Sequence, residues 1–452
     1  MKLPAISSLV SATPLNTRDV TRSSSRVCTG IIATRVGSRL KRKTDKQATL
    51  AVHAGDRKKL GEFTPTTTPI YATSSFFYES SEDLEKVFND EKEGNVYSRY
   101  GNPTVSAFED QVATLEGADY GVATASGMAA IHMVLLGGLL DRRKSIVAAD
   151  VLYGQTTALL QKVFEPFGVE TRYADPCDLA AFEAAVAKAQ PGCILVESIS
   201  NPLLRVPALD KIAEIAKRYD AQLIVDATFT TPVLSRPLEL GVDIVVHSAT
   251  KYLSGHGDTL GGIVLGKQDS YPTINYLRKT LGPNAGPFDS YLAMRGVKTL
   301  SLRMEKQCRN AALVARQLAE CSAVERVYFP GNPDHPDYET CVRLFPEELF
   351  GAMVSFDLAG GRERVLAFLD ALEMTVPATS LGDVQSMALY PAMSSHRDLA
   401  PKQRHRLGIG DGLVRLSVGI EDASDIIGDI VQAVERSAKV VVQPATDQRS
   451  ES

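Results

Sequence analysis

The chain has 452 residues, of which 44% are hydrophobic and 23% are charged, and its formal net charge at pH 7 is −5. This length and hydrophobic content support a large folded core of two or three lobes and exclude a chain that is disordered throughout. The acidic balance excludes a general nucleic-acid binder, because phosphate affinity comes chiefly from concentrated Lys and Arg. No apolar run reaches the roughly 20 residues that a membrane helix requires. The composition favours a globular protein that works on small molecules.

Residues 1–47 differ in composition from everything after them. They are rich in Ser, Thr, Arg and Lys, and Asp19 and Asp45 are their only acidic residues. This composition is typical of an organellar transit peptide. We expect a disordered extension that directs the protein to a plastid or mitochondrion; the alternative is a cytoplasmic protein with a basic extension that has no targeting role.

Residues 48–104 are expected to form an N-terminal arm that ends in a chemically unusual loop. The stretch 97–104 reads YSRYGNPT and combines aromatic residues, an arginine and a Gly-Asn-Pro turn. Turn chemistry alone is one interpretation of this loop. The functional alternative is an anion-binding loop that uses Arg99 and the Tyr97 hydroxyl.

The stretch 120–131, YGVATASGMAAI, indicates a strand, a turn of small residues and the start of a helix. Free backbone N–H groups at such a helix start, with the helix dipole behind them, favour a phosphate. Small residues at the turn let a phosphate approach closely. A Ser-Gly turn is also common as a plain helix cap, so the alternative of a structural cap stays open.

Strands and helices then alternate along the chain. Short apolar runs predict strands, and amphipathic patterns between them predict helices at 178–190 and 210–219. Such alternation is typical of an α/β fold with a mostly parallel sheet flanked by helices. Ligands of such sheets bind at the carboxyl ends of the strands. The predicted strands cover residues 145–149, 193–197, 223–226, 242–246 and 262–265.

Polar side chains follow these strands where the sheet rule places ligands. A lysine at a strand end can form a Schiff base with an aldehyde cofactor, and neighbouring hydroxyls can hold the cofactor's phosphate. An aspartate that ends an apolar run is costly to desolvate without a cationic partner, and a pyridinium nitrogen would be one. A solvated lysine and a capping aspartate are the alternatives on local grounds. The strand-end residues are Tyr153, Asn201, Asp226, Ser248, Thr250 and Lys251.

The remaining chain divides into two further parts. We expect a cofactor-binding domain at 105–304 and a smaller C-terminal α/β domain at 305–440, followed by a polar tail at 441–452. The six cysteines show no CxxC pair and no disulfide-like clustering, so we expect reduced, mostly packed thiols and no metal site.

With these stretches assembled, the chain resembles the pyridoxal-phosphate-dependent enzymes of cysteine and methionine metabolism. This trans-sulfuration family includes cystathionine γ-lyase, cystathionine γ-synthase and methionine γ-lyase. The resemblance runs from about residue 50 to 440 and is strongest at 97–104, 125–130 (ASGMAA), 248–256 (SATKYLSGH) and 413–421 (LVRLSVGIE). It implies an aspartate-aminotransferase-like fold (fold type I) and pyridoxal 5'-phosphate as the cofactor.

The resemblance also implies a role for each strand-end residue. Lys251 would carry the cofactor and later move protons, while Asp226 would pair with the ring nitrogen. Tyr153 would stack on the ring and serve as acid or base at the leaving group. Asn201 would hydrogen-bond the phenolic oxygen of the cofactor.

Substrate and phosphate contacts follow from the same resemblance. Arg415, helped by Ser380, would clamp the substrate carboxylate. Because part of the phosphate site would come from a neighbouring subunit's arm, we expect a homotetramer built from dimers that share active sites. The phosphate would be held by Gly127 and Met128 amides, by Ser248 and Thr250, and by Tyr97 and Arg99 of the neighbouring subunit.

Three positions depart from the family pattern. Gln155 follows the Tyr-Gly pair where the well-known bacterial methionine γ-lyases carry Cys, and Ala227 replaces the usual Asn. Thr379 stands where cystathionine enzymes usually carry Glu, which weakens the case for a substrate with a distal ammonium group such as cystathionine.

We therefore expect a carbon-sulfur γ-lyase that acts on methionine, homocysteine or cystathionine and releases 2-oxobutanoate, ammonia and a thiol. The close alternative is γ-replacement on an O-acylated homoserine, as a cystathionine γ-synthase performs it. A third hypothesis is a non-catalytic binding protein of this fold. The presence of four residues together argues against it: Lys251, Asp226, Tyr153 and Arg415.

Overall fold

The computed structural model describes residues 44–438 except 60–61, 141 and 398. The predicted transit-like extension therefore lies outside the described residues up to residue 43, and the predicted tail at 441–452 lies wholly outside them. The first described helix, α1, begins at the edge of the predicted extension and covers Gln47–His53.

A seven-stranded sheet forms the larger of two sheets, in the order β1-β7-β6-β5-β4-β2-β3. Its strands β2, β3, β4, β5 and β6 run parallel, whereas β7 is antiparallel to both of its neighbours. The prediction of a mostly parallel sheet is confirmed. The strands are β1 (Tyr120–Thr124), β2 (Ser145–Ala149), β3 (Glu170–Ala174), β4 (Cys193–Glu197), β5 (Gln222–Asp226), β6 (Ile244–His247) and β7 (Gly262–Gly266).

The edge strand β3 has no counterpart among the predicted strands. Its sequence, ETRYA, carries charged residues, and its side chains are exposed or half-buried. An edge strand has only one neighbour and one partly covered face, so it lacks the continuous apolar run that marks the buried strands.

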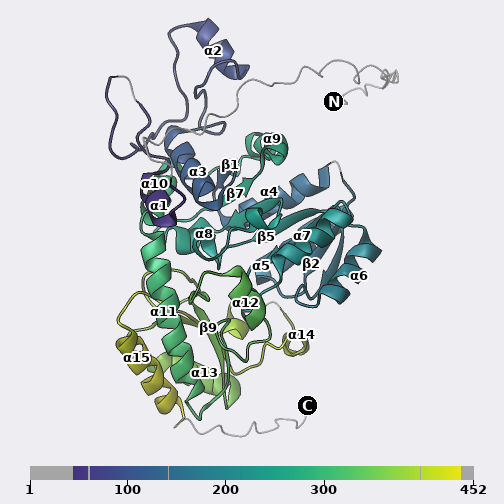
Figure 1. The fold of residues 1–452 in the computed structure, drawn as a ribbon, viewed down its shortest axis with the longest axis vertical. Coiled ribbons are helices and arrows are strands. Elements are labelled where there is room, and N and C mark those ends of the chain that lie inside the picture. The colour runs from purple at the N-terminus through teal and green to yellow at the C-terminus, as the bar shows by residue number, and fades with distance from the viewer. Residues whose placement is uncertain (1–43, 60–61, 141, 398, 439–452) are drawn as a thin grey trace, which may run out of the picture. The chain divides into compact units, whose positions relative to one another are not determined.

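Helices pack against this sheet (Figure 1). Helix α4 (Gly127–Leu140) lies along β6 and β7 and buries half of its residues. Helix α7 (Leu209–Arg218) buries one apolar stripe, including Ile212 and Ile215, against β5 and keeps its charged side outward. The sheet edge that carries the strand ends is thereby held on a rigid support.

A second sheet, with the order β10-β11-β12-β9-β8, follows in the sequence. Helices α13 (Gly361–Ala371) and α15 (Ala423–Ser437) pack on each other and share a separate apolar core with this sheet. The strands are β8 (Val324–Tyr328), β9 (Met353–Leu358), β10 (Val376–Pro377), β11 (Met387–Leu389) and β12 (Leu413–Ser417).

Helix α11 (Leu300–Ala319) connects the two cores. Its Met304 belongs to the core of the larger sheet, whereas Ala311 and Val314 belong to the core of the smaller one. The domain boundary that the sequence placed between 304 and 305 therefore falls inside a continuous helix. A separate helix, α10 (Pro287–Val297), ends just before α11 begins.

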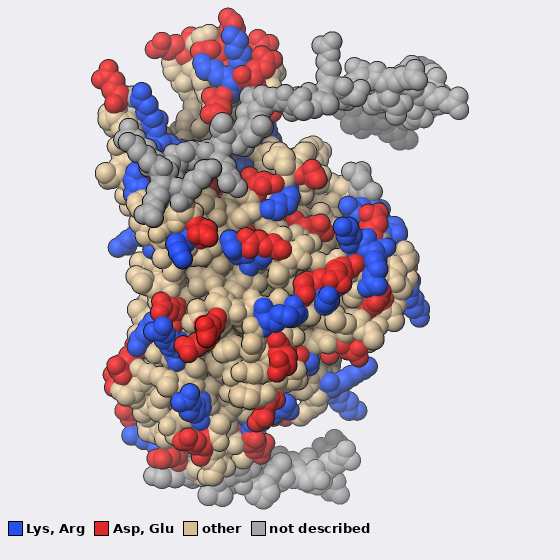
Figure 2. Space-filling model, in the orientation of Figure 1, with Lys and Arg blue, Asp and Glu red and all other residues tan. Residues whose placement is uncertain are grey.

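The remaining described α-helices differ in length, from four residues in α8 to 14 in α3. No helix in the described ranges has the length and apolarity to cross a membrane. On the face shown in Figure 2, Lys and Arg side chains are interspersed with Asp and Glu, so this face presents no single-sign basic field of the kind that binds nucleic acid. The remaining described α-helices are α2 (Ser81–Phe88), α3 (Pro103–Glu116), α5 (Gly154–Leu159), α6 (Leu179–Ala189), α8 (Thr231–Leu234), α9 (Tyr271–Leu281), α12 (Tyr338–Leu344) and α14 (Pro401–Arg406).

Candidate active site

A cavity of about 440 Å³ lies at the carboxyl edge of the larger sheet and also reaches the smaller sheet. Glu197 ends β4 and Asp226 ends β5, and these are the positions where doubly wound sheets bind ligands. The structure brings nine of the predicted site residues together around this cavity. They are Gly127, Met128, Tyr153, Asn201, Asp226, Ser248, Thr250, Lys251 and Arg415.

Lys251 lies in the segment η4 (Ala249–Leu253), shortly after β6, and its own backbone is non-helical, with φ −94° and ψ −131°. Its Nζ donates a hydrogen bond of 3.0 Å to the Ser380 Oγ, so the predicted Ser380 also meets the lysine. Burial, followed by the positive charge of Arg415, lowers the pKa of Lys251 to about 8. A larger fraction of this amine is therefore neutral near physiological pH than for a surface lysine, which suits it as a nucleophile or base.

Asp226 is half-buried at the cavity wall and accepts two hydrogen bonds from Thr228. The Thr228 Oγ1 lies 2.5 Å and the Thr228 backbone nitrogen 3.0 Å from Asp226 Oδ1. Burial raises the pKa of Asp226, while the two Thr228 hydrogen bonds act in the opposite direction. A carboxyl group in this position is stabilised in its charged form by a cationic ligand atom.

The start of α4 and the loop after β6 face each other closely. A Cβ added at Gly127 would lie 2.8 Å from the Ser248 Cβ, so glycine is required for this approach. The first turn of this 14-residue helix thus lies beside the Ser248 and Thr250 side chains at the cavity wall. Backbone N–H groups of a helix start next to hydroxyls form a cradle that suits a phosphate.

Arg415 reaches the cavity from β12 of the smaller sheet, and it is 3% exposed. One guanidinium nitrogen donates to the Asn201 Oδ1 at 3.0 Å, and the other donates to the Ser380 carbonyl at 3.3 Å. The Nε has no hydrogen-bond partner among the described residues. Burial lowers the pKa of Arg415 to about 10, so the group is still cationic at neutral pH and retains a donor for a carboxylate.

Tyr97 and Arg99 are not among the residues around the cavity of the same chain. The Arg99 guanidinium donates to the Lys279 carbonyl and lies over the Tyr97 and Tyr100 rings, 5.5 and 4.9 Å from their centroids. Their predicted role in a neighbouring subunit's site stays a prediction.

Glu197 is a cavity residue that the sequence reasoning missed. It accepts backbone N–H groups from Tyr153 at 2.6 Å and from Asn201 at 3.3 Å. Burial, followed by the charge of Asp226, raises the pKa of Glu197 to about 8. The available signal was an acidic residue that ends the otherwise apolar strand CILVE, in the same position as Asp226 in its strand.

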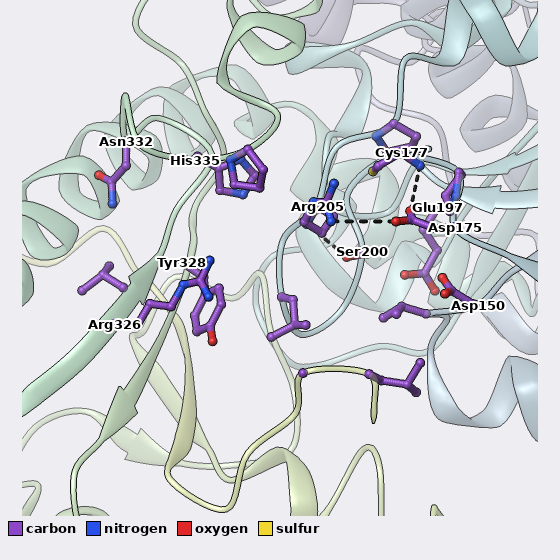
Figure 3. A pocket seen from close by; sticks show the side chains of 18 of the residues that line it. Asp150, Asp175, Cys177, Glu197, Ser200, Arg205, Arg326, Tyr328, Asn332 and His335 are labelled. Carbon is purple, nitrogen blue, oxygen red and sulfur yellow. Dashed lines mark hydrogen bonds and ion pairs between the residues drawn. The ribbon is translucent and has the colours of Figure 1, made fainter. Parts of the chain in front are cut away.

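A larger cavity of about 690 Å³ shares only Glu197 with the first (Figure 3). Figure 3 shows Asp150 and Asp175 on one side of it and Arg326 and His335 on the other. Its described lining contains no lysine. Size alone therefore does not locate the chemistry, because an amine that can hold an aldehyde lies only at the smaller cavity of the two.

The α/β sheet with a cavity-lining lysine at one strand end, an aspartate at the next and a phosphate cradle defines the class of lysine-anchored pyridoxal-phosphate enzymes. Residues 48–435 match the model of the family described as Cys/Met metabolism PLP-dependent enzyme, and the chain belongs to this family. The predictions of family, cofactor and enzymatic nature are confirmed.

The match to this chain covers almost the whole length of each of three curated relatives. O-succinylhomoserine sulfhydrylase of Pseudomonas aeruginosa is 41% identical over 85% of this chain and 94% of its own. L-methionine gamma-lyase of Pseudomonas putida is 41% identical over 86% of this chain and 98% of its own. Cystathionine gamma-lyase of Bacillus subtilis is 40% identical over 86% of this chain and 99% of its own.

Solved structures agree with the fold. The cystathionine gamma-lyase from Lactobacillus plantarum complexed with L-serine has a TM-score of 0.81 and 36% identity, and covers 87% of this chain and 99% of its own. The cystathionine gamma synthase from Xanthomonas oryzae pv. oryzae with aminoacrylate and cysteine has a TM-score of 0.81 and 35% identity, covering 88% and 100%. The predicted fold type I architecture is confirmed.

The lowered pKa of Lys251 predicts how capture of pyridoxal phosphate by the apoprotein depends on pH. Only the neutral amine attacks an aldehyde, and a pKa depressed from 10.5 to about 8 makes the neutral form dominant above pH 8. The capture rate, followed by cofactor absorbance in rapid mixing, is expected to rise with pH and level off above about 8. A rate that still rises tenfold per pH unit near pH 10, about the ordinary lysine value, would contradict the assignment.

Proposed function

We propose that this enzyme is a carbon-sulfur γ-lyase that converts a sulfur amino acid and water to 2-oxobutanoate, ammonia and a thiol. The observation that carries the proposal is one cavity that combines the Lys251 amine, the buried Arg415 guanidinium and a set of apolar side chains. The family membership and the two γ-lyases among the relatives support it.

Each polar residue has a task that its position permits. Pyridoxal phosphate, when bound, withdraws electrons from the α-carbon of the amino acid. Arg415 binds the substrate carboxylate, and Asp226 offers the ring nitrogen a carboxylate partner. The Lys251 amine, held by Ser380, moves the proton at the α-carbon and then removes the β-proton whose loss allows the γ-substituent to leave. The Tyr153 hydroxyl, on a side chain that is 39% exposed at the cavity, gives a proton to the leaving thiolate.

The wall of the cavity favours a thioether or thiol over a distal ammonium group. Glu197 and Asp226 are the only acidic residues in its described lining, and both already accept hydrogen bonds. Thr379 lines the wall at the position where an acid would receive a distal ammonium group. Methionine and homocysteine therefore fit better than cystathionine. The apolar lining residues are Met128, Ile131, Ile199, Phe229, Leu381 and Leu389.

A second candidate function, γ-replacement on an O-acylated homoserine, has two specific observations in its favour. One relative of 41% identity is an O-succinylhomoserine sulfhydrylase. Arg397 also lines the cavity and would place a second cation near the distal carboxylate of a succinyl group.

We also propose that Tyr97 and Arg99 complete the phosphate site of a neighbouring subunit within a homotetramer. The arm that carries them exposes large apolar side chains, with Phe63 72% and Phe77 87% exposed in the single chain. Exposed apolar groups of this size are typical of a subunit interface.

Release of 2-oxobutanoate by the cofactor-loaded full chain tests the proposal. Separate reactions contain methionine, homocysteine, cystathionine, or an O-acylated homoserine with and without a thiol. We expect release from methionine or homocysteine without added thiol, and several-fold slower release from cystathionine. If only the acylated homoserine reacts and added thiol suppresses the keto acid, the enzyme performs γ-replacement and the lyase proposal is wrong.

A further inference from the structure

Glu197 connects two loops that carry functional residues. One carboxylate oxygen accepts the Tyr153 backbone N–H at 2.6 Å, and the other accepts the Asn201 backbone N–H at 3.3 Å. Tyr153 precedes helix α5, whereas Asn201 follows β4 in the chain. A single carboxyl group therefore holds both loops at a defined separation.

The connection extends to the residue assigned to the substrate carboxylate. The Asn201 Oδ1 accepts a hydrogen bond of 3.0 Å from the guanidinium of Arg415, which comes from the smaller sheet. A shift of the Asn201 loop would therefore move Arg415 or break its hydrogen bond. Through Asn201, Glu197 influences both the cofactor side and the substrate side of the cavity.

Glu197 itself has a rigid support. It ends β4, pairs in register with Asp226 of β5, and is 9% exposed. The next residue, Ser198, donates its backbone N–H to the Asp226 carbonyl at 2.9 Å. Because Glu197 and Asp226 are fixed on the same sheet edge, the loops that bind Glu197 are aligned relative to Asp226.

The position of Glu197 is electrostatically unfavourable for a negative charge. Burial and the neighbouring Asp226 both disfavour the ionised form of Glu197. A neutral side chain would avoid this cost but would not offer two equivalent acceptor oxygens. Each backbone N–H meets a different oxygen of Glu197, and both hydrogen bonds favour its ionised form.

We propose that Glu197 is a positioning residue that sets the separation of Tyr153 and Asn201 and thereby orients the cofactor ring and the Arg415 clamp. It touches neither substrate nor cofactor in this role. The inference rests on the proposed function for the identity of those ligands. The contacts that carry it belong to the protein alone.

The test compares Glu197→Gln with the wild-type holoenzyme as the full chain. Glutamine keeps the shape but replaces one acceptor oxygen with a donor, so one backbone N–H loses its partner. We expect a fall in kcat of about 10- to 100-fold, since small misplacements of catalytic groups have effects of this size, with KM changed less than fivefold. The visible circular dichroism of the bound cofactor should change, and amide exchange in the apoprotein should accelerate at 150–156 and 198–203.

Asp175→Asn is the matched control. Asp175 follows the edge strand β3 of the same sheet, accepts the Cys177 backbone N–H at 2.8 Å, and lines the larger cavity only. Its variant is expected to keep the wild-type kcat, the cofactor circular dichroism and the exchange at both loops. The proposal would be overturned if Asp175→Asn and Glu197→Gln lost the same activity, and if that loss matched the loss of folded protein. Glu197 would then have a structural role only.

Glu197→Asp provides a second, independent variant. It keeps the charge but is one methylene shorter, so it reaches one loop and not both. We expect a loss of kcat smaller than that of Glu197→Gln, with an altered cofactor spectrum; if the glutamine variant does not fold, this variant decides. Wild-type kcat, dichroism and loop exchange in either folded variant would overturn the proposal.

Inactivity of the wild type toward every tested sulfur amino acid would instead refute the γ-lyase function. The cofactor dichroism and the amide exchange would still report on the role of Glu197.

Discussion

Replacement of Lys251 by alanine is expected to reduce turnover on the order of 10³-fold or more, the largest effect of any single change in this chain. The amine is both the point of covalent attachment for an aldehyde and the base that moves the α-proton, and general-base catalysis alone contributes roughly 10²–10⁴-fold. No other lysine lines the described cavity, so no neighbouring amine replaces it. The measurement is kcat with the best substrate, together with borohydride reduction and mass analysis of the peptide that retains the cofactor.

The control for this substitution is Lys211→Ala. Lys211 is half exposed on α7, pairs with Glu214 at 2.8 Å, and does not line the cavity. It should show wild-type kcat and wild-type cofactor trapping on Lys251. Cofactor that is still trapped on Lys251→Ala protein, or a kcat within tenfold of wild type, would show that another residue carries the cofactor.

Replacement of Asp226 by alanine is expected to lower kcat by about 10²–10³-fold, the size of effect seen when one preorganised polar group is removed from an active site. The variant removes the one carboxylate assigned to the ring nitrogen, so the nitrogen loses the partner that keeps it protonated and electron-withdrawing. Cofactor content should decrease less than activity, because the phosphate cradle and Lys251 are unchanged. The measurements are kcat and cofactor stoichiometry on the same samples.

Asp243→Asn is the matched control for the aspartate. Asp243 lies just before β6, and its carboxylate accepts the Leu223 backbone N–H at 2.7 Å, at the opposite end of the same β5 strand. It should keep the wild-type kcat. If Asp226→Ala loses activity only as far as it loses bound cofactor, the role of Asp226 is in binding and not in the chemistry.

Local sequence patterns are enough to place much of the fold. The runs 145–149 and 193–197 are β2 and β4 with the same bounds, because continuous apolar segments have to be covered on both faces. Asp226 ends one such apolar strand and Lys251 follows another. The rule that ligands bind at the carboxyl ends of parallel strands was therefore enough to place the two residues together. Small residues at the helix start around Gly127 likewise indicated a close approach there.

Other features depend on contacts between residues far apart in the chain. Strand β3 has no apolar run of its own and exists because β2 offers it an edge. The long helix α11 belongs to two cores at once, which no local pattern separates. Cavity size was also uninformative, since the larger cavity lacks an amine in its described lining.

The sequence by itself therefore determined the family, the cofactor and the residues expected to hold it, because these are properties of short motifs with strict local geometry. Only the tertiary structure decided that Glu197 joins the Tyr153 and Asn201 loops, and that Asn201 meets Arg415 of the other sheet. The physical reason is that the local sequence shows a carboxyl group at a strand end but does not show which distant loop it will contact. Its partners come from loops that are 44 and 4 residues away in sequence and converge only when the sheet is complete.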